Sequence, residues 1–270
     1  MASRCSNPRW LACIPFEAYL HYHCCYLFPN YLNGHAIDAL QLWWGEGAME
    51  RPRGLIFDLD GTLTDSAPAI GRAVNRVWAG KNRKPLTDIV VREYIGDGPA
   101  ILIARARKGS GLACDPAAET AETDEFMRFY AEDGPGGDIF PGAVEVCEKL
   151  VKAGLQLAVC TNKPQDAAWR LLSALGLAPF MVGCVGGDIV PFRKPDPAHV
   201  LAALDLFKNV PPSGALMVGD GRQDVAAAEA AGLGVVVASY GYGGVAAERP
   251  DLPVIKTIND LLPLLGVGKV

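Results

Sequence analysis

Acidic residues stand directly behind an apolar run in the stretch GLIFDLDGTLTDS, residues 54–66. Two of them, Asp58 and Asp60, lie one residue apart at the end of what has the composition of a buried strand. Ionised carboxylates are costly to remove from water unless a cation or a firm set of hydrogen bonds receives them. The stretch therefore predicts a positively charged partner at this point of the fold.

Further polar residues follow other apolar runs of the same kind. The run ALMVGD ends at Asp220 with Asp224 close behind, Thr161 and Asn162 end a second run, and Lys194 follows a third. Ligands of open parallel sheets bind at the carboxyl edge of the strands, so we expect these side chains to meet there. Carboxylates with few other oxygen ligands suit Mg²⁺, which keeps several waters and binds a substrate phosphate.

The elements that would position these residues have the pattern of a parallel sheet. From Gly54 on, short runs rich in Val, Ile and Leu alternate with segments of helical period. The predicted strands span residues 54–60, 155–161, 181–187, 215–220 and 233–239. Crossover helices are predicted over GAVEVCEKLVKAG and KPQDAAWRLLSALG. We therefore predict an α/β fold with a Rossmann-like parallel sheet core flanked by helices.

A separate module is expected between the first and second strands, because a crossover with loops needs far fewer residues than this interval provides. Helical spacing of apolar residues starts at Ile70, a second helix follows Pro99, and a third contains Phe126. We expect a small helical cap domain at residues 67–135. The core domain would combine residues 49–66 with residues 136–270.

Residues 1–48 differ in composition from the rest, with nine of the 22 aromatic residues but only five charged residues. The segment lacks the pattern of a secretory signal. We expect an N-terminal extension that is either disordered or a mis-assigned start, with Met49 as the natural first residue. Zinc binding by HYHCC, residues 21–25, is an alternative whose spacing fits no usual structural zinc site.

Composition excludes several classes of protein. The net charge of −5 argues against a nucleic-acid partner, which would require clustered Lys and Arg. No stretch approaches the roughly 18 consecutive apolar residues of a membrane-spanning helix. The four cysteines after residue 50 lack C-x-x-C spacing, and we expect them to be reduced, buried thiols. We expect a soluble cytoplasmic protein, monomeric or homodimeric, with no membrane partner.

The candidate residues resemble the motifs of the haloacid dehalogenase-like hydrolase superfamily. DLDGT at residues 58–62, Thr161, Lys194 and GDGRQD at residues 219–224 match its four motifs in order. Residues 49–266 further resemble phosphoglycolate phosphatases, in FDLDGTLTDSAPAIGRAVNRV, YIGDGPAILIARA, FPGAVEVCEKL and YGYGG. The resemblance implies a Mg²⁺-dependent hydrolase of a small-molecule phosphate ester, with 2-phosphoglycolate as the first candidate.

The same resemblance implies a role for each site residue. Asp58 would become an aspartyl-phosphate, and Asp60 would act first as acid and then as base. The metal ligands would be the side chains of Asp58 and Asp220 and the main-chain carbonyl of Asp60. Asp224 would orient the metal's waters or the lysine ammonium. The expected phosphate-binding residues are Thr161, Asn162 and Lys194, with main-chain N–H groups at Gly61, Thr62 and Asn162.

Other interpretations stay open beside this one. A sugar-phosphate phosphatase or a phosphomutase would share the same residues, and a non-catalytic regulatory module is a more distant alternative. Several neighbouring residues are expected to be structural. These expectations are helix capping by Asp65 and Ser66, a surface position for His199, a flexible turn at GYGG (residues 241–244), and solvent exposure of Arg105 and Arg107.

Overall fold

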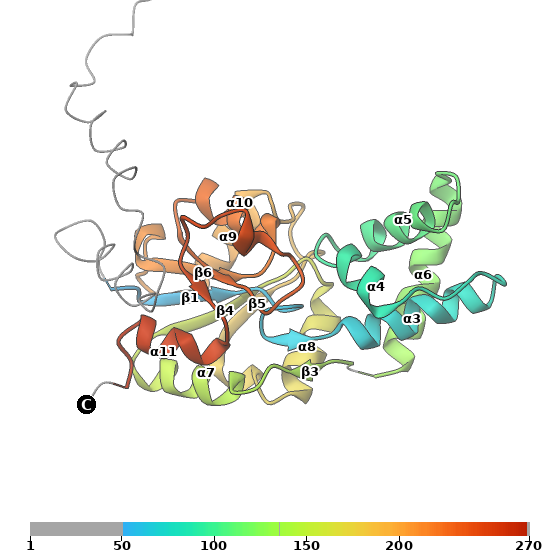
Figure 1. Cartoon of the computed structure of the whole chain (residues 1–270). Coiled ribbons are helices and arrows are strands. Elements are labelled where there is room, and N and C mark those ends of the chain that lie inside the picture. The colour runs from blue at the N-terminus through green and yellow to red at the C-terminus, as the bar shows by residue number, and fades with distance from the viewer. Residues whose placement is uncertain (1–50, 135, 269–270) are drawn as a thin grey trace, which may run out of the picture. The chain divides into compact units, whose positions relative to one another are not determined.

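A six-stranded parallel sheet forms the centre of the computed structural model, which describes residues 51–134 and 136–268 (Figure 1). The strand order is β5-β4-β1-β6-β7-β8, and every neighbouring pair is parallel. The strands are β1 (Gly54–Phe57), β4 (Gln156–Cys160), β5 (Met181–Val185), β6 (Ala215–Gly219), β7 (Gly234–Ala238) and β8 (Val254–Ile255). Strand β1 therefore lies inside the sheet, between β4 and β6.

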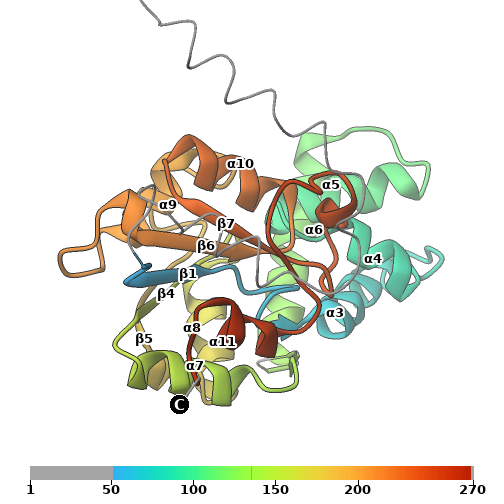
Figure 2. The ribbon, with the colours of Figure 1, turned by 60° about the vertical axis from the view of Figure 1, so that its left-hand side comes forward.

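Alternate side chains of the strands enter two apolar cores on opposite faces of the sheet. On β1, Leu55 and Phe57 face one core and Ile56 faces the other, and all three are fully buried. Figure 2 shows the helices in two layers: α7 (Ala143–Lys152), α8 (Gln165–Ala174) and α11 (Leu261–Leu264) on one face, α9 (Pro197–Leu204) and α10 (Arg222–Ala230) on the other. Burial on both faces explains the continuous apolar runs, and the predicted α/β sheet core with flanking helices is confirmed.

Four further helices follow one another along the chain between two short strands, β2 (Thr64–Asp65) and β3 (Asp138–Ile139). These two strands pair antiparallel with each other. They are α3 (Ala67–Ala79), α4 (Asp88–Tyr94), α5 (Pro99–Gly109) and α6 (Pro116–Glu132). Their apolar sides form a third cluster, which contains Ile70, Trp78 and Phe126. Figure 1 shows these helices as a group beside the sheet layers.

Short elements account for most differences from the sequence-based expectation. Helix α4 has seven residues and buries only Val91, so it carries almost no apolar stripe. Strands β2, β3 and β8 have two residues each. The short 3-10 helices are η2 (Ala178–Phe180), η3 (Pro212–Gly214), η4 (Val245–Ala247) and η5 (Ile258–Asp260). Elements of this length leave too few positions for a hydrophobic period to be read.

Two expectations about environment concern particular residues. Cys147, Cys160 and Cys184 are buried free thiols, as predicted. Cys114 is also a free thiol, but it is exposed, so the prediction of a buried thiol is wrong there. Within the described ranges, none of the helices has both the length and the apolar character needed to cross a membrane. The N-terminal extension and the HYHCC alternative lie outside the described residues.

Candidate active site

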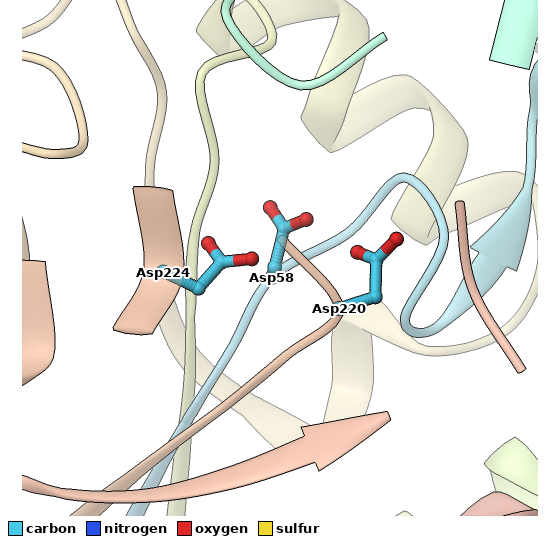
Figure 3. Close-up of side chains that lie close together, drawn as sticks. All are labelled: Asp58, Asp220 and Asp224. Carbon is cyan, nitrogen blue, oxygen red and sulfur yellow. The ribbon is translucent and has the colours of Figure 1, made fainter. Parts of the chain in front are cut away.

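The carboxyl ends of three adjacent strands bring the predicted residues together. Asp58 follows β1, Thr161 follows β4 and Asp220 follows β6, while β4 and β6 flank β1 in the sheet. Figure 3 shows the Asp58 carboxylate between those of Asp220 and Asp224, and carboxylate oxygens of the three residues lie within 4.8 Å of one another. This edge, where the strand order reverses, is where open α/β sheets bind ligands.

The Lys194 ammonium lies against two of these carboxylates. Its Nζ donates to Asp58 Oδ1 at 2.8 Å, to Asp224 Oδ1 at 2.7 Å and to the Cys160 carbonyl oxygen at 2.6 Å. These contacts use all three ammonium donors. With the side chain almost wholly buried, Lys194 is held as a fixed cation at the edge of the sheet, as the sequence predicted for its position.

The charges of this cluster do not balance within the described residues. Three buried carboxylates and one ammonium leave two negative charges when all the acids are ionised. Carboxylate oxygens are the donors that hard divalent cations prefer. The composition and the net charge of the cluster therefore fit a divalent metal ion.

The pKa values of the cluster reflect the same surplus of acid. Burial raises the pKa of Asp58 to about 8; Lys194 opposes this shift, while Asp224 and Asp220 add to it. Burial and the Asp224 charge also raise the pKa of Asp220 to about 6. Burial by itself would lower the pKa of Lys194, but Asp224 and Asp58 raise it above its ordinary value. A second cation at this point would favour the ionised acids.

The loop after β7 positions Asp220. The main-chain N–H groups of Tyr242 and Gly243 donate to Asp220 Oδ2 at 2.6 and 3.0 Å, and the Thr62 hydroxyl donates to Oδ1 at 3.2 Å. A Cβ atom on Gly241 would lie 2.4 Å from the Asp220 Cβ, so only glycine fits this close approach. GYGG is therefore a support for an acidic residue rather than the flexible turn expected from the sequence.

Asp224 and Asn162 hold Lys194 from two sides. The two Asp224 oxygens accept bonds from Lys194 Nζ and from the Gly221 N–H, the latter at 2.9 Å. The Asn162 amide donates to the carbonyl oxygens of Lys194 and Gly96, both at 2.9 Å, and accepts from the Lys194 N–H at 3.0 Å. The side chain of Asn162 thus links the loop that contains Lys194 to the GDGP loop, residues 96–99, which leads into α5.

Asp60 has its own set of partners. Lys163 Nζ lies 3.0 and 3.1 Å from the two carboxylate oxygens of Asp60, and the Ser66 hydroxyl donates to Oδ1. The prediction that Ser66 caps a helix is wrong: the residue precedes α3, but its side chain makes no capping bond. Its hydroxyl has a stronger acceptor in the Asp60 carboxylate.

The side-chain partners of Asp65 lie outside α3. Its two oxygens accept bonds from Arg92 on α4 and from the Tyr242 hydroxyl. Both the Asp65 and Arg92 side chains are partly exposed. Asp65 therefore connects α4 to the loop after β7 that supports Asp220. The spacing of residues in the sequence did not predict this connection.

Two further expectations require correction. The Gly61 and Thr62 N–H groups were expected to bind phosphate. They donate to the carbonyl oxygens of Thr64 and Leu59, respectively, and so close the turn after β1. His199 is fully buried and its Nδ1 accepts the Lys194 N–H at 3.2 Å, while burial lowers its pKa to about 4. A neutral ring is what this acceptor role requires.

The two arginines of α5 also differ from the expectation. Arg107 is buried, and its guanidinium donates to Glu122 Oε1 at 3.0 Å. Arg105 is partly exposed and forms an ion pair with Asp97. Arg107 is thus committed to packing within the helix group, and Arg105 to the loop before α5.

A pocket separates the acidic edge from the helix group. Asp58, Asp60, Thr161 and Lys163 line its sheet side, together with Asn162. The opposite wall is largely apolar and consists of Ile70, Leu102, Phe126, Met127 and Tyr130 from α3, α5 and α6. An apolar wall against charged groups limits water and strengthens the electrostatic interactions inside.

Comparison with known proteins assigns the family. A model of the haloacid dehalogenase-like hydrolases matches residues 52–232. The chain belongs to this family. Phosphoglycolate phosphatase of Rhodospirillum rubrum is 44% identical over 196 residues, which cover 71% of this chain and 81% of that protein. Phosphoglycolate phosphatase 1 of Pseudomonas aeruginosa is 39% identical over 223 residues, which cover 80% of each.

A solved structure agrees with the sequence relatives. The crystal structure of a predicted phosphoglycolate phosphatase from Haemophilus somnus matches with a TM-score of 0.72 and 30% sequence identity, over 79% of this chain and 98% of that one. Together these likenesses identify the chain as a phosphatase among the haloacid dehalogenase-like hydrolases.

Proposed function

We propose that this phosphatase hydrolyses small phosphate monoesters through an aspartyl-phosphate on Asp58, with Mg²⁺ as its metal and 2-phosphoglycolate as its substrate. The observation that carries the proposal is the arrangement of the acidic edge. One carboxylate, Asp58, lies beside Lys194 and two further acids at the edge of a pocket, and a second, Asp60, lies in the same pocket with a cation of its own. The names of the relatives support the choice of substrate.

In the first step, an oxygen of Asp58 attacks phosphorus in line with the ester oxygen. The bond between phosphorus and the ester oxygen breaks, and its electron pair leaves with that oxygen. Protonated Asp60 gives its proton to this alkoxide, so that the alcohol leaves neutral. Lys194 already holds Asp58 Oδ1, which leaves Oδ2 as the attacking atom.

In the second step, Asp60 has become a base and takes a proton from water. The resulting hydroxide attacks phosphorus, the bond to the Asp58 oxygen breaks, and inorganic phosphate leaves. Asp60 is again protonated and Asp58 is again a carboxylate, so the cycle closes. A carboxylate nucleophile replaces one difficult displacement by two easier ones.

Charge decides what else the site needs. A phosphate dianion near the Asp58 carboxylate is repelled by about 4 kcal/mol for each pair of unit charges 4 Å apart at an effective dielectric constant near 20. Bound by the side chains of Asp58 and Asp220 and the Asp60 carbonyl, Mg²⁺ would offset this repulsion and stabilise the phosphoryl oxygens. The Thr161 hydroxyl would bind a phosphoryl oxygen directly, and Lys194 would do so by exchanging one of its three present acceptors for that oxygen. Asp224 would keep Lys194 in place.

The helices α3–α6 would serve as the cap over the site. Under this proposal, residues 67–135 form a cap domain on a core of residues 49–66 and 136–270. The apolar pocket wall from these helices and the bond between Asn162 and Gly96 support the assignment. Such a cap would exclude water from the aspartyl-phosphate until the alcohol has left.

A panel of phosphate esters tests the proposal. The panel contains 2-phosphoglycolate, glucose 6-phosphate, glucose 1-phosphate and p-nitrophenyl phosphate, with released phosphate measured in Mg²⁺ and in EDTA. We expect Mg²⁺-dependent phosphate release with 2-phosphoglycolate preferred, and a loss of turnover in Asp58→Asn. Unchanged turnover in Asp58→Asn would refute the nucleophile. Transfer of the phosphoryl group to a second sugar position, with no phosphate release, would instead identify a phosphomutase.

A further inference from the structure

Lys163 is the one cationic side chain among the described residues that line the pocket next to Asp58 and Asp60. It follows β4 and is 7% exposed. Its Nζ lies 4.7 Å from the centre of the Tyr130 ring, on α6. Lys163 therefore lies between Asp60, which is both acid and base in the proposed reaction, and the apolar wall that would face the rest of the substrate.

The contacts of Lys163 leave it able to receive a substrate group. Two Asp60 oxygens lie within 3.0 and 3.1 Å of Nζ. Burial by itself would lower the pKa of Lys163, but the Asp60 charge and a hydrogen bond with the Tyr130 side chain raise it, so the ammonium stays charged. Because an ammonium has three N–H donors and two of these contacts go to one carboxylate, an entering carboxylate can take one of those donors while Lys163 keeps a bond to Asp60.

The other cations near the site are committed elsewhere. Lys194 has three acceptors and is proposed to bind the transferred phosphoryl group. Arg107 is paired with Glu122, and Arg105 is paired with Asp97; neither is among the residues that line this pocket. Arg92, Arg105 and Arg222 line a second pocket that includes Asp60 and Asp220. Each of the three is paired with an acid: Asp65, Asp97 and Glu248, respectively. In the pocket that contains both Asp58 and Asp60, Lys163 is therefore the cation placed to receive a second anionic group of a substrate.

We propose that Lys163 recognises a carboxylate on the substrate and so selects small phosphate esters that carry a second negative charge. The inference rests on the proposed function and narrows its substrate class. Lys163 would act on the leaving group, whereas Lys194 acts on the phosphoryl group. The bond to Asp60 would at the same time place the carboxylate end of the substrate beside the residue that protonates the leaving oxygen.

The test compares esters that differ in the carboxylate. We would measure kcat/KM for 2-phosphoglycolate and 2-hydroxyethyl phosphate, and for 3-phosphoglycerate and glycerol 3-phosphate. In the wild-type protein, the carboxylate ester of at least one pair should be preferred. In Lys163→Met this preference should fall roughly 10- to 100-fold, the range expected for one hydrogen bond to a charged group. Lys163→Arg keeps the charge and should retain part of the preference.

The ratio of kcat/KM between the two esters of a pair distinguishes recognition of the substrate carboxylate by Lys163 from a role in which Lys163 only positions Asp60. If Lys163 only positions Asp60, Lys163→Met slows both esters of a pair by the same factor, and the inference is overturned. A folded fraction below one cancels from the ratio, because both esters are measured on one preparation. If turnover is too slow, dissociation constants of the same esters in an Asp58→Asn background, with and without Lys163→Met, give the comparison; an unchanged ratio again overturns the inference.

A control variant and the choice of substrates separate a failure of the Lys163 inference from a failure of the proposed substrate. Lys152→Met removes an exposed lysine that pairs with Glu148 at 2.6 Å, and it should leave the preference unchanged. A wild-type protein that prefers 3-phosphoglycerate but ignores 2-phosphoglycolate refutes the proposed substrate while the Lys163 ratio still supports the inference. A wild-type protein that shows no preference within either pair refutes the role of Lys163 itself.

Discussion

Replacing Lys194 by methionine should destabilise the metal-free protein strongly. Lys194 is 2% exposed, and its ammonium has Asp58 and Asp224 within 2.8 Å. Removing one partner of a buried ion pair typically costs about 3–5 kcal/mol, because the remaining charge has lost its compensation. For a chain of 270 residues, roughly 2–4 °C per kcal/mol then gives a fall in Tm of about 6–20 °C.

The loss should depend on pH and on the neighbouring acid. Protonation of Asp58 relieves the uncompensated charge, so Lys194→Met should be less destabilising at pH 5 than at pH 8. Combining Lys194→Met with Asp224→Asn removes one of the two carboxylate charges that Lys194 compensates in the wild-type protein. The double variant should therefore lose at least about 1 kcal/mol less than the sum of the two single losses.

Thermal and urea denaturation in EDTA measure these effects, with Lys152→Met as the matched control. That substitution removes an exposed lysine, and a change within about 0.5 kcal/mol is expected. Turnover by Lys194→Met should fall about 100- to 1000-fold, as expected for loss of one charged donor at the transition state. A stability loss below about 1 kcal/mol, or strictly additive single variants, would show that the three acids do not depend on this ammonium.

Two other predictions follow from the same contacts. The raised pKa values of Asp58 and Asp220 mean that the folded metal-free protein binds more protons than the unfolded chain between their ordinary value of 3.8 and about 8, so its stability should fall as pH rises through this window. The Tm increase on adding Mg²⁺ should accordingly be larger at pH 8 than at pH 6, and an equal increase at both would contradict it. Asn162→Ala should raise KM and lower the free energy of unfolding by about 1–3 kcal/mol, because the main-chain groups of Lys194 and Gly96 lose their hydrogen-bond partner. As a control, Asn75→Ala breaks two similar bonds to Leu86, and it should lower the Tm but leave KM unchanged.

The sheet was predictable because its strands are buried on both faces. Every residue of β1, β6 and β7 is buried, so each appears in the sequence as an uninterrupted apolar run. The five predicted strands are present, although 54–60 ends at Phe57 because the chain leaves the sheet to place Asp58 and Asp60. Helix α4 was missed because a short helix with one buried residue has no periodic signature.

The meeting of acids, a hydroxyl and a lysine at the ends of the strands was also predictable, because ligands of open parallel sheets bind at that edge. The contacts that support these residues were not predictable. Sequence spacing placed Ser66 at a helix start and His199 on a surface, whereas the folded chain uses Ser66 to bind Asp60 and His199 to accept the Lys194 N–H. Such roles depend on which acceptor is nearest in space, and local propensity contains no information about that.

The amino-acid sequence alone determined the strands, the alternation with helices and the acidic residues at the strand ends, since these follow from local burial patterns and residue chemistry. Only the tertiary structure decided which groups compensate which charges. Lys194 lies 136 positions from Asp58, and Lys163 lies 103 positions from Asp60, yet each pair is in contact. A charge far along the chain has no preferred partner until the sheet order brings strand ends together, because electrostatic attraction depends on distance in space.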